Sequence, residues 1–330
     1  MKLHWRAIGL LTIATTTLVP MASAAAASPS PAITASCFKV TATIHVALEP
    51  FGVGVNPVTN TVYVTNGNQN TVSVIDGQTN KITATFPGGG SPDVAAVNPR
   101  TDTVYVTNLP GGTVSVIDGR TNKITATVTV GHDPAGIAVN PATNRIYVVD
   151  GEANTLSVIS GRTNKVVAAV PVGNTPEGVA VNLATDTIYA TSVFGKDMSV
   201  VDGHTNKVTA TIKLGGEPLD AAVDPKTDTI YVTNGTVQVI DGHTNKITAT
   251  VGVGKVPAGV AVDQNIGKVF VASANSDSAS VIDEGTNRVT ATFGVGREPL
   301  VVAANPRTHA VYTANFSSST VSVITRHCRI

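Results

Sequence analysis

The chain has 330 residues and carries 22 basic and 22 acidic side chains, so its formal charge is zero. This balance argues against a broad electrostatic surface for nucleic acid or anionic lipid. The length is sufficient for one large domain with a substantial core.

The first 27 residues are predicted to be a secretory signal peptide. Lys2 and Arg6 give a basic start, and the apolar run from Ala7 to Val19 has 13 residues, too few to span a bilayer. Ala22-Ser23-Ala24 offers a cleavage site with small residues. Removal of this segment leaves 20 basic and 22 acidic residues, a formal charge of −2. An anchoring or disordered N-terminus is the alternative.

Residues 28–36 are rich in Ser, Pro and Ala, which predicts a short flexible leader. Residues 37–330 are then expected to form a single domain. No later stretch of the sequence is long and apolar enough for a transmembrane helix. The sequence therefore predicts a secreted protein, in the extracellular space or the cell envelope, without a membrane span.

A unit of about 42 residues recurs seven times in this domain. A fixed period of this length is typical of repeat architectures. The clearest marker is Tyr-Val-Thr-Asn or a variant of it, at spacings of 42, 42, 42, 42, 39 and 42 residues. The aromatic residue that opens each marker is Tyr63, Tyr105, Tyr147, Tyr189, Tyr231, Phe270 or Tyr312.

Each unit predicts four short strands separated by turns. In the third unit the strands are expected at residues 136–139, 145–149, 156–159 and 165–172. They are rich in β-branched residues, and the intervening Asn, Pro, Gly and Thr favour turns. Helical periodicity is absent from the repeats.

Four strands in each of seven units predict an all-β fold, a seven-bladed β-propeller with four antiparallel strands per blade. A four-stranded blade has two apolar faces, and packing the blades in a ring buries both. All six tyrosines of the protein occupy the same position of the repeat. We therefore expect them to pack between blades and to have no chemical role.

The last unit ends at Ile330, after its third strand. Lys39 to Ile44 matches Lys123 to Val128, the fourth strand of a complete unit. The N-terminal segment is therefore predicted to supply the missing outer strand, so that the last blade is closed by the two ends of the chain.

The two cysteines fall at the same point of this composite blade. Cys37 and Cys328 both align with Thr121, in a turn where a complete blade has continuous chain. An oxidising compartment permits a disulfide between them. Two free thiols, or a lipid on Cys37, are the competing interpretations, and the residues before Cys37 do not favour the lipid.

The repeats resemble those of the YVTN β-propeller family, which includes YncE-like proteins. The resemblance covers roughly residues 38–330 and depends on three recurring motifs. These motifs are Tyr-Val-Thr-Asn, Val-Ile-Asp-Gly-x-Thr-Asn-Lys (as at 116–123) and Ala-Val-Asn-Pro (as at 138–141). The resemblance implies a propeller and permits a cell-surface role, but it selects no activity, because propellers carry many unrelated functions.

The loops that join one blade to the next carry the candidate functional residues. Four of these loops have an acid just before the recurrent proline, and cationic residues such as Arg297 lie nearby. Together the acids could bind a divalent cation such as calcium, or a polyol, at the mouth of the channel. Solvated acids that cap backbone NH groups or pair with Lys and Arg are the favoured alternative. The four acids are Glu49, Asp133, Glu217 and Glu298.

Three phenylalanines, Phe51, Phe194 and Phe316, are expected on the same face. Phe51 should lie near Phe316, because the first and seventh blades are neighbours. Aromatic side chains on an exposed rim can form a binding patch. The alternative is that they fill the joint between blades.

Established catalytic and phosphate-binding motifs are absent from the sequence. We therefore expect a secreted, noncatalytic, monomeric scaffold without a cofactor, which binds an extracellular protein or glycan through the loop face. A metal-dependent lactonase- or lyase-like enzyme, with the four loop acids as ligands, is the first alternative. Binding of single-stranded nucleic acid is the second, and the charge and the lack of tryptophan in the mature chain oppose it.

Overall fold

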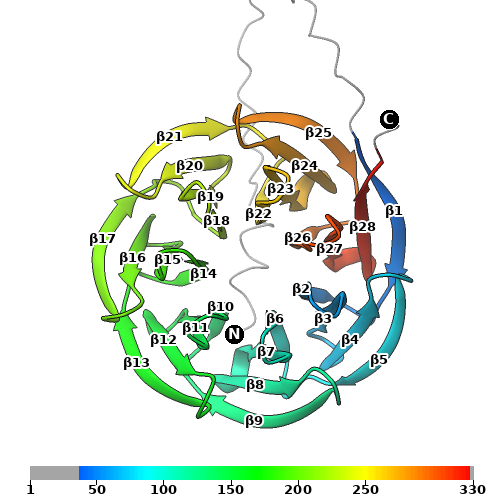
Figure 1. Ribbon diagram of the computed structural model, residues 1–330, viewed down its shortest axis with the longest axis horizontal. Coiled ribbons are helices and arrows are strands. Elements are labelled where there is room, and N and C mark those ends of the chain that lie inside the picture. Colours follow the sequence, from blue (N-terminus) through cyan, green and yellow to red (C-terminus); the bar gives the residue numbers. More distant parts are fainter. Residues whose placement is uncertain (1–36, 328–330) are drawn as a thin grey trace, which may run out of the picture.

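The computed structural model describes residues 37–327. Seven four-stranded antiparallel sheets form a ring, as the repeats predicted (Figure 1). The fold is a seven-bladed β-propeller. The predicted signal peptide, the leader and Cys328 lie outside the described residues.

The blades are numbered here in chain order, with their strands given from the centre of the ring outwards. Blade 1 comprises β2 (Pro50–Asn56), β3 (Thr61–Asn66), β4 (Thr71–Asp76) and β5 (Lys81–Pro87). Blade 2 comprises β6 (Pro92–Asn98), β7 (Thr103–Asn108), β8 (Thr113–Asp118) and β9 (Lys123–Thr129). Blade 3 comprises β10 (Pro134–Asn140), β11 (Arg145–Asp150), β12 (Thr155–Ser160) and β13 (Lys165–Pro171). Blade 4 comprises β14 (Pro176–Asn182), β15 (Thr187–Ser192), β16 (Asp197–Asp202) and β17 (Lys207–Lys213).

The remaining blades have the same order. Blade 5 comprises β18 (Ala221–Asp224), β19 (Thr229–Thr233), β20 (Val237–Asp241) and β21 (Lys246–Val251). Blade 6 comprises β22 (Pro257–Asp263), β23 (Lys268–Ser273), β24 (Ser278–Asp283) and β25 (Arg288–Gly294). Blade 7 comprises β26 (Pro299–Ala304), β27 (Val311–Asn315), β28 (Thr320–Arg326) and β1 (Phe38–His45). Short 3-10 turns, η1 (Leu109–Gly111), η2 (Ala274–Ser276) and η3 (Phe316–Ser318), lie between the second and third strands of blades 2, 6 and 7.

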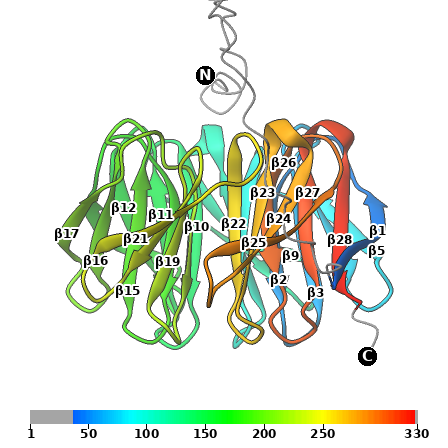
Figure 2. The same cartoon turned by 90° about the horizontal axis from the view of Figure 1, so that it is seen from above.

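Seen from the side, the loops gather on two opposite faces of the ring (Figure 2). One face holds the loops that join successive blades together with those between second and third strands. We call it the loop face. The other holds the remaining turns of each blade.

The two chain ends close blade 7. Strand β1 pairs antiparallel with β28, from Phe38 opposite Arg326 to His45 opposite Thr320. The His327 amide also donates a hydrogen bond to the Cys37 carbonyl oxygen. The predicted closure is therefore confirmed. The disulfide stays a prediction, because Cys328 is not described.

The tyrosines pack between blades, as expected. Tyr147 of blade 3 is fully buried and contacts Ile188 and Ala190 of blade 4. The Tyr63 hydroxyl donates to the Gly119 carbonyl oxygen of the next blade, at 3.3 Å. Phe270 takes the same place between blades 6 and 7. The core is thus a set of repeated inter-blade layers.

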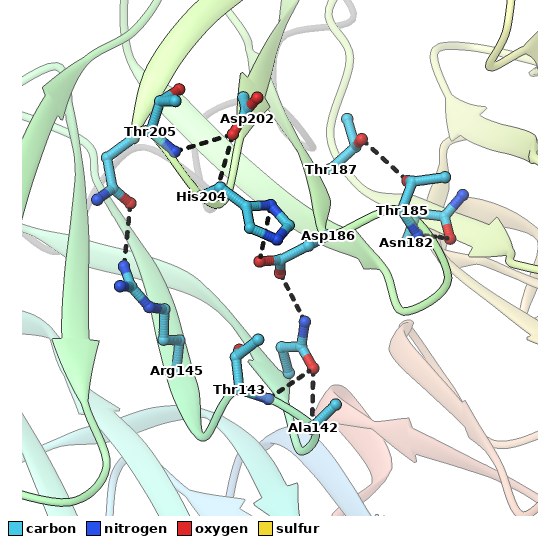
Figure 3. Close-up of polar contacts among 12 residues, drawn as sticks. Ala142, Thr143, Arg145, Asn182, Thr185, Asp186, Thr187, Asp202, His204 and Thr205 are labelled. Atoms are coloured by element: carbon cyan, nitrogen blue, oxygen red, sulfur yellow. Dashed lines mark hydrogen bonds and ion pairs between the residues drawn. The ribbon is translucent and has the colours of Figure 1, made fainter.

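Polar latches join the blades on the face opposite the loop face. Asp186 of blade 4, labelled in Figure 3 beside His204, is the acceptor of one such bond. The Asn140 side chain of blade 3 donates to it at 2.6 Å. His204 Nδ1 lies 3.7 Å from the other carboxylate oxygen of Asp186. Asp186 has a left-handed backbone, with a φ of 55°, in the turn between first and second strands. Equivalent bonds join Asn56 to Asp102, Asn98 to Asn144, Asn182 to Asp228 and Asn305 to Asn60.

At the joint between blades 5 and 6, a pair of acids takes the place of this side-chain hydrogen bond. In most blades a glycine of the outer turn lies against the latch side chain; a Cβ at Gly242 would approach Asp228 Oδ1 to 2.3 Å. In blade 6 the glycine and the polar residue have exchanged places. Gly267 stands at the position of Asp228, and Glu284 stands in the outer turn at the position of Gly242. Glu284 therefore faces Asp224 of blade 5. Burial, the Asp224 charge and a hydrogen bond to Asp224 raise the pKa of Glu284 to about 8.

This acid pair predicts a pH-dependent stability. The folded protein keeps the Glu284 proton up to about pH 8, whereas the unfolded chain loses it near its ordinary pKa of 4.5. The folded state binds more protons between these values, so stability falls as the pH rises through this window. Asp224→Asn restores an amide donor like Asn182. It should stabilise the protein by about 1–2 kcal/mol at pH 8, after allowance for solvent screening at partly buried Glu284.

Urea unfolding at pH 5 and pH 8 measures this effect. Glu152→Gln, which removes an exposed acid elsewhere, is the matched control and should change stability little at either pH. Equal gains from both variants, or a gain from Asp224→Asn that is the same at pH 5 and pH 8, would contradict the role of the pair.

Candidate ligand-binding site at the channel mouth

The first residues of the inner strands meet at one end of the ring. Proline opens most of these strands, as in Pro92 and Pro176, and the chain reaches it from the loop face. A cavity of about 90 Å³ lies where these strand ends converge. It is lined by residues that directly follow the prolines, so the mouth of the channel belongs to the loop face.

Close contact between inner strands makes this mouth narrow. A Cβ added to Gly136 would approach the Glu177 carbonyl oxygen of the next blade to 2.5 Å, and one added to Gly178 would approach the Leu219 carbonyl oxygen equally closely. Glycine at these two positions therefore lets neighbouring blades approach backbone to backbone.

Three carboxylic acids line the cavity: Asp93 of β6, Glu177 of β14 and Asp220, which precedes β18. Asp93 is 3% exposed, and its carboxylate has no hydrogen-bond partner within residues 37–327. Burial, together with the charge of Asp133, raises the pKa of Asp93 well above its ordinary value. A buried carboxylate without a partner is costly when ionised.

Glu177 lines the same cavity but is only partly buried. Burial raises its pKa well above the ordinary range, and the charges of Asp93, Asp133 and Asp220 raise it further. No hydrogen bond to its carboxylate is made by the part of the chain that the structure describes. The mouth thus holds two carboxylic acids, Asp93 and Glu177, whose raised pKa favours the protonated form unless a positive group binds beside them.

Asp220 is the anchored member of the group. Its carboxylate accepts hydrogen bonds from the Ala221 amide at 2.8 Å and from the Val260 amide of blade 6 at 3.0 Å. Burial raises the pKa of Asp220 to about 6, although these two bonds oppose the rise. The acid thereby also ties blade 5 to blade 6 at the mouth.

The facing part of the ring, in blades 6, 7 and 1, is apolar. Ala258 and Leu300 are buried there, and half-buried Phe51 and Phe316 pack against them. The two phenylalanine rings meet edge to face, with centroids 6.0 Å apart. The expected proximity of Phe51 and Phe316 is confirmed. Both help to fill the joint between blades 7 and 1, while Phe51 also lines the cavity.

Phe194 lies apart from this pair. It belongs to the loop between β15 and β16 of blade 4 and is 51% exposed. Of the three phenylalanines, it is therefore the most exposed on the loop face.

The four acids predicted from the loops occupy a different position. None of them is among the described residues that line the cavity. Glu49, Asp133 and Glu298 have a left-handed backbone, with φ between 54° and 59°, and their carbonyl oxygens accept amide hydrogen bonds from the facing loop. Val256 has the same conformation and the same bond, so this position has a backbone role that needs no acid.

The side chains of these acids have separate environments. Asp133 is close enough to Asp93 and Glu177 to raise their pKa. Glu298 accepts a hydrogen bond from the Ser317 hydroxyl, and Arg297 donates to the Ser317 carbonyl oxygen at 3.1 Å. Glu217 is exposed. Within residues 37–327, no three His, Cys, Asp or Glu side chains gather as ligands of a metal ion. The calcium-binding and metal-enzyme hypotheses stay predictions.

The acids that line the cavity were not predicted from the sequence, although a signal for them exists. They lie one or two residues after the recurrent proline, where the other blades have small or apolar residues. The residue directly after each proline is Phe51, Asp93, Ala135, Glu177, Leu219, Ala258 or Leu300. An acid at a position that is otherwise apolar marks a departure from the architecture of the repeat.

The fold and the site define the protein as a seven-bladed β-propeller with an acid-lined channel mouth. The chain is similar in fold to the hydrazine synthase of Kuenenia stuttgartiensis, with a TM-score of 0.77 and 20% identity over 83% of this chain and 95% of that chain. No family model and no curated protein sequence matches the chain. At this identity the likeness shows the fold alone. Within residues 37–327, no helix has the length and apolarity to cross a membrane.

Proposed function

We propose that this protein is a secreted, noncatalytic propeller of the YVTN-repeat, YncE-like kind, which binds an extracellular protein or glycan through its loop face. Secretion is supported by the composition of residues 1–27, and the family by the motifs repeated in residues 38–330. The sequence contains no established catalytic motif, which favours binding over catalysis.

One observation carries the proposal. The buried layers between blades repeat the same residue types around the ring, whereas the residues at the channel mouth differ from blade to blade. Packing explains the repeated residues, but it does not require Asp93 or Glu177. A rigid scaffold that carries a variable, irregular end is the usual arrangement of a binding site.

An exposed aromatic side chain on the same face supports it. Phe194 is 51% exposed, and Leu48, in the loop before β2, is 50% exposed. Aromatic residues are among those that contribute most to protein interfaces. The loop face thus combines an acidic cavity with accessible apolar groups around it.

Site-specific photo-crosslinking tests this proposal. We expect p-benzoylphenylalanine in place of Phe194 to yield discrete crosslinked products when the purified protein is returned to the medium of the cells that secrete it. The matched control places the same group at His243, whose side chain is 76% exposed on the opposite face. Products at both positions alike, or at neither, would count against binding through the loop face.

A further inference from the structure

The channel mouth has two chemically different sides. Its acids come from blades 2, 4 and 5, and a further acid, Asp133, lies in the loop that leads into blade 3. The facing side, in blades 6, 7 and 1, is formed by Ala258, Leu300 and Phe51. A ligand that satisfies both sides must have a positive group and an apolar part.

In the described part of the chain, the acids of the cavity have no basic side chain beside them in its lining. Asp93 is 3% exposed, lines the cavity and has no hydrogen-bond partner for its carboxylate among the described residues. Of the described residues that line the cavity, none is Lys, Arg or His. Buried carboxylates are normally paired, because an unpaired buried charge is strongly unfavourable. A protonated acid avoids this cost, and a cation bound in the cavity would allow the acids to ionise.

The size and spacing of the site restrict the cation. Ligand pockets for whole small molecules usually measure about 300–1,000 Å³, whereas this cavity is about 90 Å³. It therefore accepts one group the size of a side chain. The described acids do not gather closely enough to ligate a metal ion together. An organic cation, which pairs with carboxylates over longer distances, fits the arrangement better than a metal ion.

We propose that the channel mouth binds an aliphatic cation, an amine or guanidinium on an apolar stem, with its charged head among Asp93, Glu177 and Asp220 and its stem against Leu300 and Phe51. This inference rests on the proposed binding function and names the ligand chemistry. A lysine or arginine side chain of a partner polypeptide and a free alkylamine share that chemistry.

The pH dependence of binding follows from the same groups. Burial raises the pKa of Asp93 and Glu177 well above their ordinary values and that of Asp220 to about 6. A cation favours the ionised acids, so it must displace their protons. An alkylammonium ion keeps its charge below about pH 10. Binding should therefore tighten at least several-fold from pH 5 to pH 8.

Methyl NMR on the whole mature protein tests the proposal, with n-butylammonium as the probe. We expect saturable shifts of the Leu219 and Leu300 methyl signals, at a concentration at least tenfold lower than for n-butanol, the neutral analogue. Glu177→Gln should weaken butylammonium binding at least tenfold. Glu217→Gln removes the same charge from an exposed position outside the cavity and should change the affinity less than twofold.

Asp93→Asn is a second variant of almost unchanged volume and should weaken binding like Glu177→Gln. Thermal unfolding identifies any variant that does not fold. Equal affinity for butanol and butylammonium, equal losses in Glu177→Gln and Glu217→Gln, or no saturable shift in the wild type would overturn the proposal.

A blocked Gly-Lys-Gly peptide distinguishes the two sources of the cation. Tighter binding of this peptide than of butylammonium assigns the site to a polypeptide side chain, and the reverse order assigns it to a free amine. A blocked peptide with norleucine in place of lysine has the apolar stem but no charge, and it should not bind. If crosslinking at residue 194 is observed but butylammonium does not bind, the proposed cationic ligand is wrong, whereas the proposed binding through the loop face is still supported.

Discussion

Cys37→Ser is expected to lower the free energy of unfolding by about 3–5 kcal/mol. The ring is closed by the pairing of β1 with β28, and the described chain reaches Cys37 and His327 at the same end of this pair. A disulfide to Cys328 would make this seam covalent. The loop it closes spans most of the chain, which corresponds to about 5–6 kcal/mol in the chain-entropy treatment, an upper value.

Guanidinium unfolding under oxidising conditions measures the loss. Cys328→Ser and the double variant should be destabilised as much as Cys37→Ser, because any of these changes removes the same bond. A reductant should destabilise the wild type and leave the variants unchanged. Two thiols that can be alkylated in the unreduced mature protein would show that the bond does not form.

Tyr147→Ala is expected to cost about 3–5 kcal/mol, the range for removal of a large buried side chain. Tyr147 is fully buried between blades 3 and 4, so its loss opens a cavity in an inter-blade layer. Its hydroxyl group also donates to Asp186 at 3.3 Å. Tyr147→Phe keeps the ring and should cost only about 1 kcal/mol.

The chain contains a natural precedent for the milder change, because Phe270 replaces tyrosine at the same position of blade 6. Unfolding midpoints of the two variants, measured at one pH, separate ring packing from the hydroxyl bond. Equal losses in Tyr147→Phe and Tyr147→Ala would mean that the hydrogen bond, and not the ring, holds these blades together.

The architecture could be predicted from the sequence because its signals are local. Alternation within each strand and the turn residues between strands are encoded within a few neighbouring positions, and the period of the tyrosines counts the blades. The incomplete last unit, together with the match of residues 39–44 to a fourth strand, also predicted how the ring closes. The proximity of Phe51 to Phe316 was predicted from the same ring, in which blades 7 and 1 are neighbours, whereas the edge-to-face geometry of the two rings is known from the structure alone.

The sequence placed the candidate site at the channel mouth of the loop face, but it did not identify the acids that line the cavity. Sequence comparison found the acids before the proline, such as Glu49 and Glu298, because charged residues in a loop are conspicuous. The structure places Asp93 and Glu177, directly after the proline, at the cavity. A shift of two positions along the chain, from one side of the proline to the other, decides whether a side chain belongs to the loop or to the inner strand, and the left-handed backbone before the proline sets that boundary.

The acid pair at the joint between blades 5 and 6 also could not be predicted from the sequence. The sequence shows Glu284 in place of the usual glycine, but only the folded ring brings Glu284 to Asp224 of the preceding blade. The sequence by itself determined the number of blades and their strands, since these depend on near neighbours along the chain. It also determined the closure, because the N-terminal segment repeats the fourth strand that the last unit lacks. The tertiary structure alone decided which carboxylates share an environment, because the inner strands that carry them are distant in sequence and meet only when the ring is formed.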